Sequence, residues 1–105
     1  MELSVLERGL LLNVLPKEGN FITVKIVHDL RMALAFDEHE LSALNFRPTP
    51  DGLGQMWDDV VPPKVVEIGE KAAEIIKQGI AALDKAGKLS EEYLPICDKF
   101  GYTGE

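Results

Sequence analysis

The stretch ITVKIVHDLRMALAFDEHELSAL, from Ile22 to Leu44, decides the fold that this sequence predicts. Apolar residues recur in it at three- and four-residue spacing to about Ala35, which predicts one helix. Phe36-Asp37 is a short break, and the pattern resumes from Glu38 to Leu44 as a second helix. Two helices joined in this way form a helix–turn–helix, which is a common shape among DNA-binding proteins.

The second helix of this unit carries the wrong charge for a DNA reader. It offers Glu38, Glu40 and His39, with Asp37 at its cap, and it has neither Lys nor Arg. In a DNA-binding helix–turn–helix this helix enters the major groove, where carboxylates meet phosphates and are repelled. The formal net charge of the chain is −7, which also disfavours nonspecific nucleic-acid binding. A nucleic-acid partner is therefore not expected from this pattern.

The whole chain, residues 1–105, has the length and composition of a single globular domain. It is 46% hydrophobic and 28% charged, and a domain of this length can bury a sufficient core without disulfides. Cys97 is the single cysteine, so an internal disulfide is impossible. The apolar run Gly9–Leu15 lacks a basic segment before it, and no stretch approaches the ~18 apolar residues of a membrane span. We therefore expect a cytoplasmic protein with no signal peptide and no membrane contact.

The N-terminal segment predicts a helix that is apolar on more than one side. Ser4 and Glu7 have the spacing of a capping box, and the helix should run to about Val14. Leu6 and Leu10 share one stripe with Val14. The residues that widen this stripe are Leu3, Leu11 and Leu15. Such a broad apolar surface is typical of a helix buried within the domain or against a second copy of the chain, so Leu6 and Leu10 are candidates for self-association.

A change of composition after the second helix predicts a small antiparallel sheet. Asn45-Phe46-Arg47 and Gln55-Met56-Trp57 can form short strands, because Pro48–Gly54 between them is rich in turn residues. Lys64–Ile68 has a β-branched composition and can add a third strand. We therefore expect two or three strands, with an exposed loop at residues 48–54.

The C-terminal half predicts two more helices, beginning with a long one at Glu70–Ala86 that Gly87 terminates. Gly79, in the middle of this helix, costs up to ~1 kcal/mol relative to Ala. A glycine there lets another helix approach closely, either inside the domain or across a self-association interface.

A last helix should run from Glu91 to about Phe100, with Ser90 as its cap and a bend at Pro95. Gly101–Glu105 should be a frayed tail. The predicted fold is therefore α+β, with five helices and a small antiparallel sheet between the third and fourth, in a winged-helix-like order.

No pattern in the sequence predicts catalysis, a cofactor or a metal site. The chain has neither a phosphate-binding loop nor a dinucleotide-binding glycine pattern. His28 and His39 have no standard ligand spacing, and Cys97 stands beside Ile96 on an apolar side, where cysteines usually behave as small hydrophobes. We therefore expect a protein that is not an enzyme and holds no cofactor.

The loop from Phe46 to Trp57 is the best candidate for binding a partner. It contributes Phe46, Arg47, Met56 and Trp57, and Trp and Met are enriched in the cores of interfaces. Two interpretations of Trp57 stay open: it closes the core over the small sheet, or it anchors a partner.

Several stretches carry a resemblance to known proteins. They are Leu11–Gly19, Phe21–Leu34, Ala43–Phe46, Trp57 and Val66–Ala72. In these stretches the chain resembles small uncharacterised proteins of similar length that bacteriophages and prophages encode. The resemblance implies a phage accessory protein that acts in the cytoplasm of the bacterial host. It includes no catalytic motif, so it assigns no functional residues.

These observations favour a non-enzymatic protein that binds a host or phage protein and self-associates as a homo-oligomer. One alternative is a winged-helix-like nucleic-acid binder. Its basic surface would come from Lys17, Lys25, Arg31, Arg47 and Lys64. The other alternative is an oligomeric protein that binds or sequesters a small ligand such as a nucleotide, with its site near Trp57.

Overall fold

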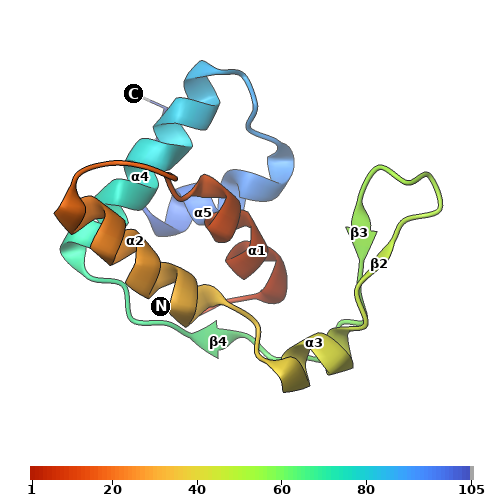
Figure 1. The fold of residues 1–105 in the computed structure, drawn as a ribbon. Helices are drawn as coiled ribbons and strands as arrows, with labels where there is room; N and C mark the ends of the chain where they lie inside the picture. The colour runs from red at the N-terminus through yellow and green to blue at the C-terminus, as the bar shows by residue number, and fades with distance from the viewer. Residues whose placement is uncertain (105) are drawn as a thin grey trace.

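The computed structural model describes residues 1–104, and its elements confirm the α+β class. In chain order they are β1 (Glu2–Leu3), α1 (Val5–Val14), α2 (Phe21–Leu34), α3 (Glu38–Leu44), β2 (Arg47–Pro48), β3 (Gln55–Met56), β4 (Lys64–Val65), α4 (Glu70–Lys85), the 3-10 helix η1 (Glu91–Tyr93) and α5 (Leu94–Lys99). Four helices, α1, α2, α4 and α5, form a body, and the β2–β3 hairpin projects from α3 beside it (Figure 1). This arrangement separates a packed core from an extended arm.

The core lies between these four helices, and Leu3 of β1 and Val66, the residue after β4, also enter it. Its buried side chains come from both ends of the sequence, and one apolar face each of α2 and α4 points into it. They include Leu11, Val14, Val27, Leu30, Leu34, Ile76, Ile80, Ile96 and Phe100. Trp57 is half-buried and lies outside this cluster. The core is therefore complete without the hairpin.

Local capping signals fix where three of the helices begin. Ser4 and Glu7 form the expected capping box at α1, and Asp37 with Glu40 forms a second one at α3. Asn20 caps α2 by accepting a hydrogen bond from the Thr23 N–H at 2.9 Å. Each cap satisfies an N–H group that a helix start leaves without an intrahelical partner.

The strands form two separate sheets of two strands each. Arg47 pairs with Met56 in the predicted hairpin of β2 and β3. The predicted strand at Lys64–Ile68 is present only as Lys64–Val65, and it pairs antiparallel with β1 instead of extending the hairpin. Val66 completes this ladder by exchanging backbone hydrogen bonds with Met1 at 2.8 and 2.9 Å.

The C-terminal segment corrects three expectations. Ser90 makes no side-chain cap, and the last helix begins as η1 and continues as α5 with Pro95 in its first turn. Gly101 and Tyr102 are anchored, because their N–H groups donate to the carbonyls of Asp98 (3.2 Å) and Cys97 (2.8 Å). A positive φ of 68° at Gly101 permits this helix end, so Gly101 and Tyr102 are not frayed. Glu105 lies outside the described residues.

Candidate functional site

A groove between α1 and the hairpin brings together the two candidate surfaces of the sequence. Leu6 and Leu10, expected to promote self-association, line its α1 side, and Phe46 and Trp57 line the opposite side. Its volume is about 750 Å³. None of the described residues that line it is charged. The groove is therefore an apolar surface with aromatic side chains, as protein-binding sites usually have.

The hairpin reaches over this groove with an uncovered apolar side chain. Leu53, between β2 and β3, is 88% exposed and lines the groove. The turn that carries it is ordered by Thr49, whose backbone N–H donates to the carbonyl of Gly54 at 3.0 Å. Gly52 has a φ of 71° in this turn, a conformation that favours glycine. A structured turn that exposes a leucine is typical of a contact surface.

A row of aromatic rings fixes the base of the hairpin. The centroid of Phe46 lies 5.8 Å from that of Phe36 and 5.7 Å from that of Trp57. Both distances lie in the range of favourable aromatic pairs. Phe36 in turn lies 4.3 Å below the guanidinium carbon of Arg8. Trp57 therefore supports the hairpin and also presents a face to the groove.

Arg8 is a buried side chain of α1 that connects the helices next to the groove. It is 0% exposed, and its guanidinium donates to two carbonyls at the end of α2, those of Leu34 (3.2 Å) and of the C-cap residue Ala35 (2.8 Å). Its two terminal nitrogens donate to the two carboxylate oxygens of Glu40 in α3, at 2.6 and 3.2 Å. One side chain of α1 thus joins α1 to the end of α2 and the start of α3.

The Arg8 contact changes the ionisation of Glu40. The hydrogen bonds from Arg8 lower the pKa of Glu40 from 4.5 to about 2, although partial burial opposes this shift. Glu40 also accepts a hydrogen bond from the Asp37 N–H at 3.1 Å. Glu40 therefore faces inward and is not one of the free carboxylates that the sequence suggested for the surface of α3.

Arg8 is not among the functional residues predicted from the sequence, although its position in α1 carries a signal. Arg8 falls on the stripe of Val5 and Leu11, whose side chains are buried. A lone arginine on a core stripe needs an acidic partner, because buried charges are rarely unpaired. Glu40, in the capping box of α3, is the acidic partner that the structure shows for Arg8.

The other candidate residues take different places. Met56 is partly exposed and Arg47 lies in β2, where its guanidinium pairs with Asp58 at 3.2 Å. Neither lines the groove. In α3, Leu44 is buried and Leu41 is 46% exposed.

Gly79 lies where α1 and α4 touch inside the domain. A Cβ atom on Gly79 would stand 2.5 Å from the carbonyl oxygen of Val14. The structure therefore shows a close helix approach at Gly79 inside the domain.

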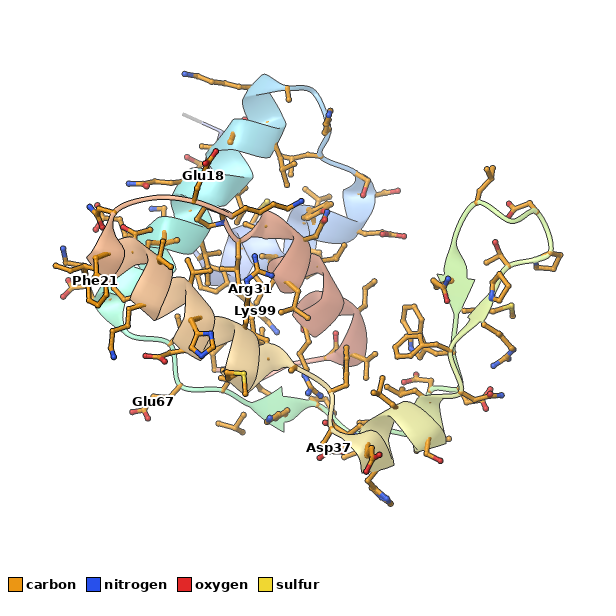
Figure 2. The ribbon with its side chains drawn as sticks, in the orientation of Figure 1. Glu18, Phe21, Arg31, Asp37, Glu67 and Lys99 are labelled. Atoms are coloured by element: carbon orange, nitrogen blue, oxygen red, sulfur yellow. The ribbon has the colours of Figure 1, made fainter. Side chains whose placement is uncertain are left out.

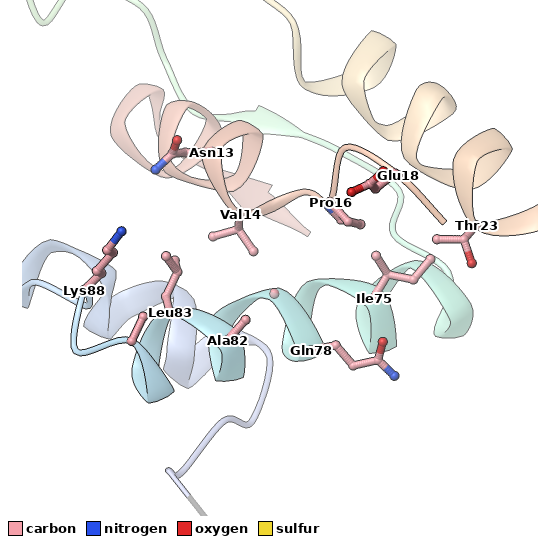
Figure 3. Close-up of a pocket in the computed structure, with 12 residues that line it drawn as sticks. Asn13, Val14, Pro16, Glu18, Thr23, Ile75, Gln78, Ala82, Leu83 and Lys88 are labelled. Atoms are coloured by element: carbon pink, nitrogen blue, oxygen red, sulfur yellow. The ribbon is translucent and has the colours of Figure 1, made fainter. Parts of the chain in front are cut away.

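A second hollow of about 490 Å³ lies beside this contact (Figure 3). Val14 and Leu83 form its apolar walls, and its charged side chains are Glu18 and Lys88. One cation opposed by one carboxylate is a weak site for phosphate groups.

Exposed acidic residues lie in and after the hairpin and in η1. Asp51 lies in the hairpin turn, and Asp58 and Asp59 follow β3. At the α1 side, Asn13 lines the groove and donates to the hydroxyl of Tyr93 at 3.1 Å. This contact places η1 next to the α1 side of the groove, and η1 carries the exposed Glu91 and Glu92. An apolar groove with an acidic surround favours an apolar partner with basic flanks.

The groups that could carry chemistry lie apart from the groove. Burial raises the pKa of the Cys97 thiol, which belongs to the core, so it is a poor nucleophile. Within residues 1–104, no three His, Cys, Asp or Glu side chains are grouped to hold a metal ion. No helix in the same range is long and apolar enough to cross a membrane.

No protein-family model matches the chain, and no curated protein or solved structure matches it either. The resemblance to bacteriophage proteins therefore stays a prediction.

Proposed function

We propose that this protein is a small, non-enzymatic interaction protein that binds another protein through the groove between α1 and the hairpin, and that it also self-associates. The observation that carries the proposal is the groove itself, an uncharged surface that places Trp57 and Phe46 opposite Leu6 and Leu10. Aromatic anchors in such pockets usually dominate the binding energy of an interface.

The surround of the groove indicates the chemistry of the partner. Three acidic residues follow or lie in the hairpin and two lie in η1, while the cation of β2, Arg47, is paired with Asp58. A partner segment with apolar side chains in its centre and Lys or Arg at its ends would complement this surface. An amphipathic helix laid in a groove is a common arrangement of this kind.

The phage origin and the place of action are part of the proposal. The resemblance to phage and prophage proteins supports a phage accessory protein that engages a host or phage protein. The partner would then be met in the bacterial cytoplasm.

The two alternative functions have weaker support. A nucleic-acid binder needs free cations, but Arg47 is paired with Asp58 and Lys64 donates to the Ala33 carbonyl at 3.1 Å. A nucleotide-binding protein needs cations grouped around phosphates, and neither the groove nor the hollow beside Gly79 provides such a group.

Capture of bacterial proteins by variants of the groove tests the proposal. The wild type, Leu53→Asp and Leu94→Ser would be immobilised at equal density and exposed to the same cytosolic extract. Leu53 lines the groove, whereas Leu94 is an exposed leucine in α5 that does not. We expect the wild type and Leu94→Ser to retain the same protein, and Leu53→Asp to retain at least ~10-fold less.

The same experiment has two outcomes that contradict the proposal. Equal capture by all three proteins would show that the groove is not the binding surface. If the wild type retains no more protein than an empty matrix does, the proposed interaction with a cytosolic protein would be contradicted.

A further inference from the structure

The solvent side of α2 carries a second apolar stripe, separate from the stripe that enters the core. At 100° per residue, Phe21, Val24, His28 and Met32 fall within about 80° of one another on the helix. Phe21 is 81% exposed and Met32 is 67% exposed, and His28 is exposed between them. Figure 2 shows Phe21 at the outer edge of the molecule, at the N-terminal end of α2. α2 therefore has two separate faces with apolar side chains, one of them without cover in the single chain.

The charged residues beside this stripe are complementary to those of a second, antiparallel α2. Lys25 and Asp29 lie on the same flank of the stripe, one turn apart, and both are exposed. In an antiparallel pair of identical helices, the same flanks face each other. A two-fold axis near the midpoint of the stripe, between residues 26 and 27, places Phe21 opposite Met32 of the second copy.

The same axis brings the opposite charges together. Lys25 of one chain then lies within about one residue's rise, ~1.5 Å, of the level of Asp29 in the other. The symmetry repeats this pair and also the contact of Phe21 with Met32, so the surface is complementary to itself. A parallel pair would place the two flanks on opposite sides and lose both charge pairs.

We infer that a second copy of this chain covers this stripe, in an antiparallel α2–α2 dimer. The inference deepens the self-association in the proposed function and rests on it, and it assigns that association to α2 while the groove stays free for a partner. A single helix face buries less than the ~800 Å² per partner of a standard interface, so we expect a dissociation constant in the micromolar range.

Sedimentation equilibrium tests the assignment with variants on the exposed face. We expect a dimer for the wild type at about 200 μM and at least ~10-fold weaker association for Phe21→Ser and for Met32→Ser. The groove variant Leu53→Asp should dimerise as the wild type does. Circular dichroism would verify that the variants, all at exposed positions, keep the fold.

Charge exchange provides a test that depends on contact between two chains. Lys25→Glu and Asp29→Lys should each weaken the homodimer, because each places like charges opposite each other. An equimolar mixture of the two should recover heterodimers, since the carboxylate introduced at position 25 of one variant then faces the ammonium group introduced at position 29 of the other. Contacts within one chain cannot produce this recovery.

The possible results distinguish two claims: that the protein self-associates, and that α2 forms the interface. A monomeric wild type at ~200 μM would contradict both. A wild-type dimer that Phe21→Ser and Met32→Ser leave unchanged, or that Leu53→Asp dissolves, would keep the self-association and overturn its assignment to α2. Failure of the mixture to form heterodimers would overturn the antiparallel pairing.

Discussion

At the scale of single residues, Arg8 decides how the parts of this protein meet. Helix ends leave carbonyl groups without intrahelical partners, and a cation near a helix C-terminus is favourable. Arg8 satisfies two such carbonyls of α2 and forms a bidentate pair with Glu40. Removing one member of a buried pair leaves the other charge without compensation, which usually costs more than the pair contributes.

We predict that Arg8→Met lowers the free energy of unfolding by about 3–5 kcal/mol. Arg8→Lys should lower it by less, because lysine keeps the charge but cannot make the bidentate contact. Urea unfolding curves of the wild type and both variants measure this difference. A loss of less than about 1 kcal/mol in Arg8→Met would mean that the buried pair is not needed for stability.

The lowered pKa of Glu40 predicts a dependence of stability on acid pH. Because the pKa falls from 4.5 in the unfolded chain to about 2 in the folded one, the contribution is complete above pH 4.5 and is lost as the pH falls toward 2. Its size is about 3 kcal/mol. The difference in unfolding free energy between the wild type and Glu40→Gln should therefore be constant near pH 6 and shrink from about pH 4.5 to pH 2. A constant difference over that interval would contradict the assignment to Glu40.

We predict that Trp57→Ala lowers the free energy of unfolding by about 1–2 kcal/mol, well below the ~3–5 kcal/mol of an emptied core site. The reason is that Trp57 is half-buried and contacts Phe46 outside the main core. Capture of the partner should fall by about 2 kcal/mol or more. Urea unfolding followed by circular dichroism is suitable because it does not depend on tryptophan emission. Loss of the fold would instead assign Trp57 to the structural core.

At the scale of elements, local signals predicted more than long-range pairing did. The capping boxes at Ser4–Glu7 and Asp37–Glu40 and the glycine end of α4 act within a few residues, so the sequence alone placed these helices. The pairing of β1 with β4 joins residues more than 60 positions apart, and a strand of two residues has no periodicity to detect.

In the candidate site, too, local sequence features could be predicted and long-range contacts could not. Phe46 and Trp57 could be predicted from the composition of a short punctuated loop. The burial of Arg8 had a signal in the core stripe of α1, but its contacts with α2 and α3 could not be predicted, because they depend on how these helices are placed in space.

The contact of α1 with α4 yields a prediction about two glycines. Gly79→Ala should destabilise the protein by about 1–3 kcal/mol, because its Cβ would meet the Val14 carbonyl oxygen at 2.5 Å and overcome the higher helix propensity of alanine. Gly9→Ala in α1 is the matched control. No atom lies within 4 Å of its added Cβ, so stability should rise by up to ~1 kcal/mol. Thermal unfolding of both variants would show opposite shifts, and equal shifts would mean that the helices do not approach at Gly79.

At the scale of the whole molecule, the helical body and the hairpin have separate tasks in this account. The body has a complete core of its own, and the hairpin projects beside it with an exposed leucine (Figure 1). The proposals assign the groove between them to a partner and the solvent face of α2 to a second copy. The net charge of −7 fits the proposed partner with basic segments, because a surface of one sign attracts the opposite sign.

Site-specific photocrosslinking tests the central claim, that the groove holds a segment of another protein, most directly. A photoreactive phenylalanine analogue would replace Leu53 in one protein and Leu94 in another, each irradiated in bacterial cytosol. The account predicts an adduct of defined mass from position 53 that disappears when Trp57→Ala is added, and no such adduct from position 94. The absence of an adduct from position 53, the same adducts from both positions, or an adduct only of doubled mass would contradict it.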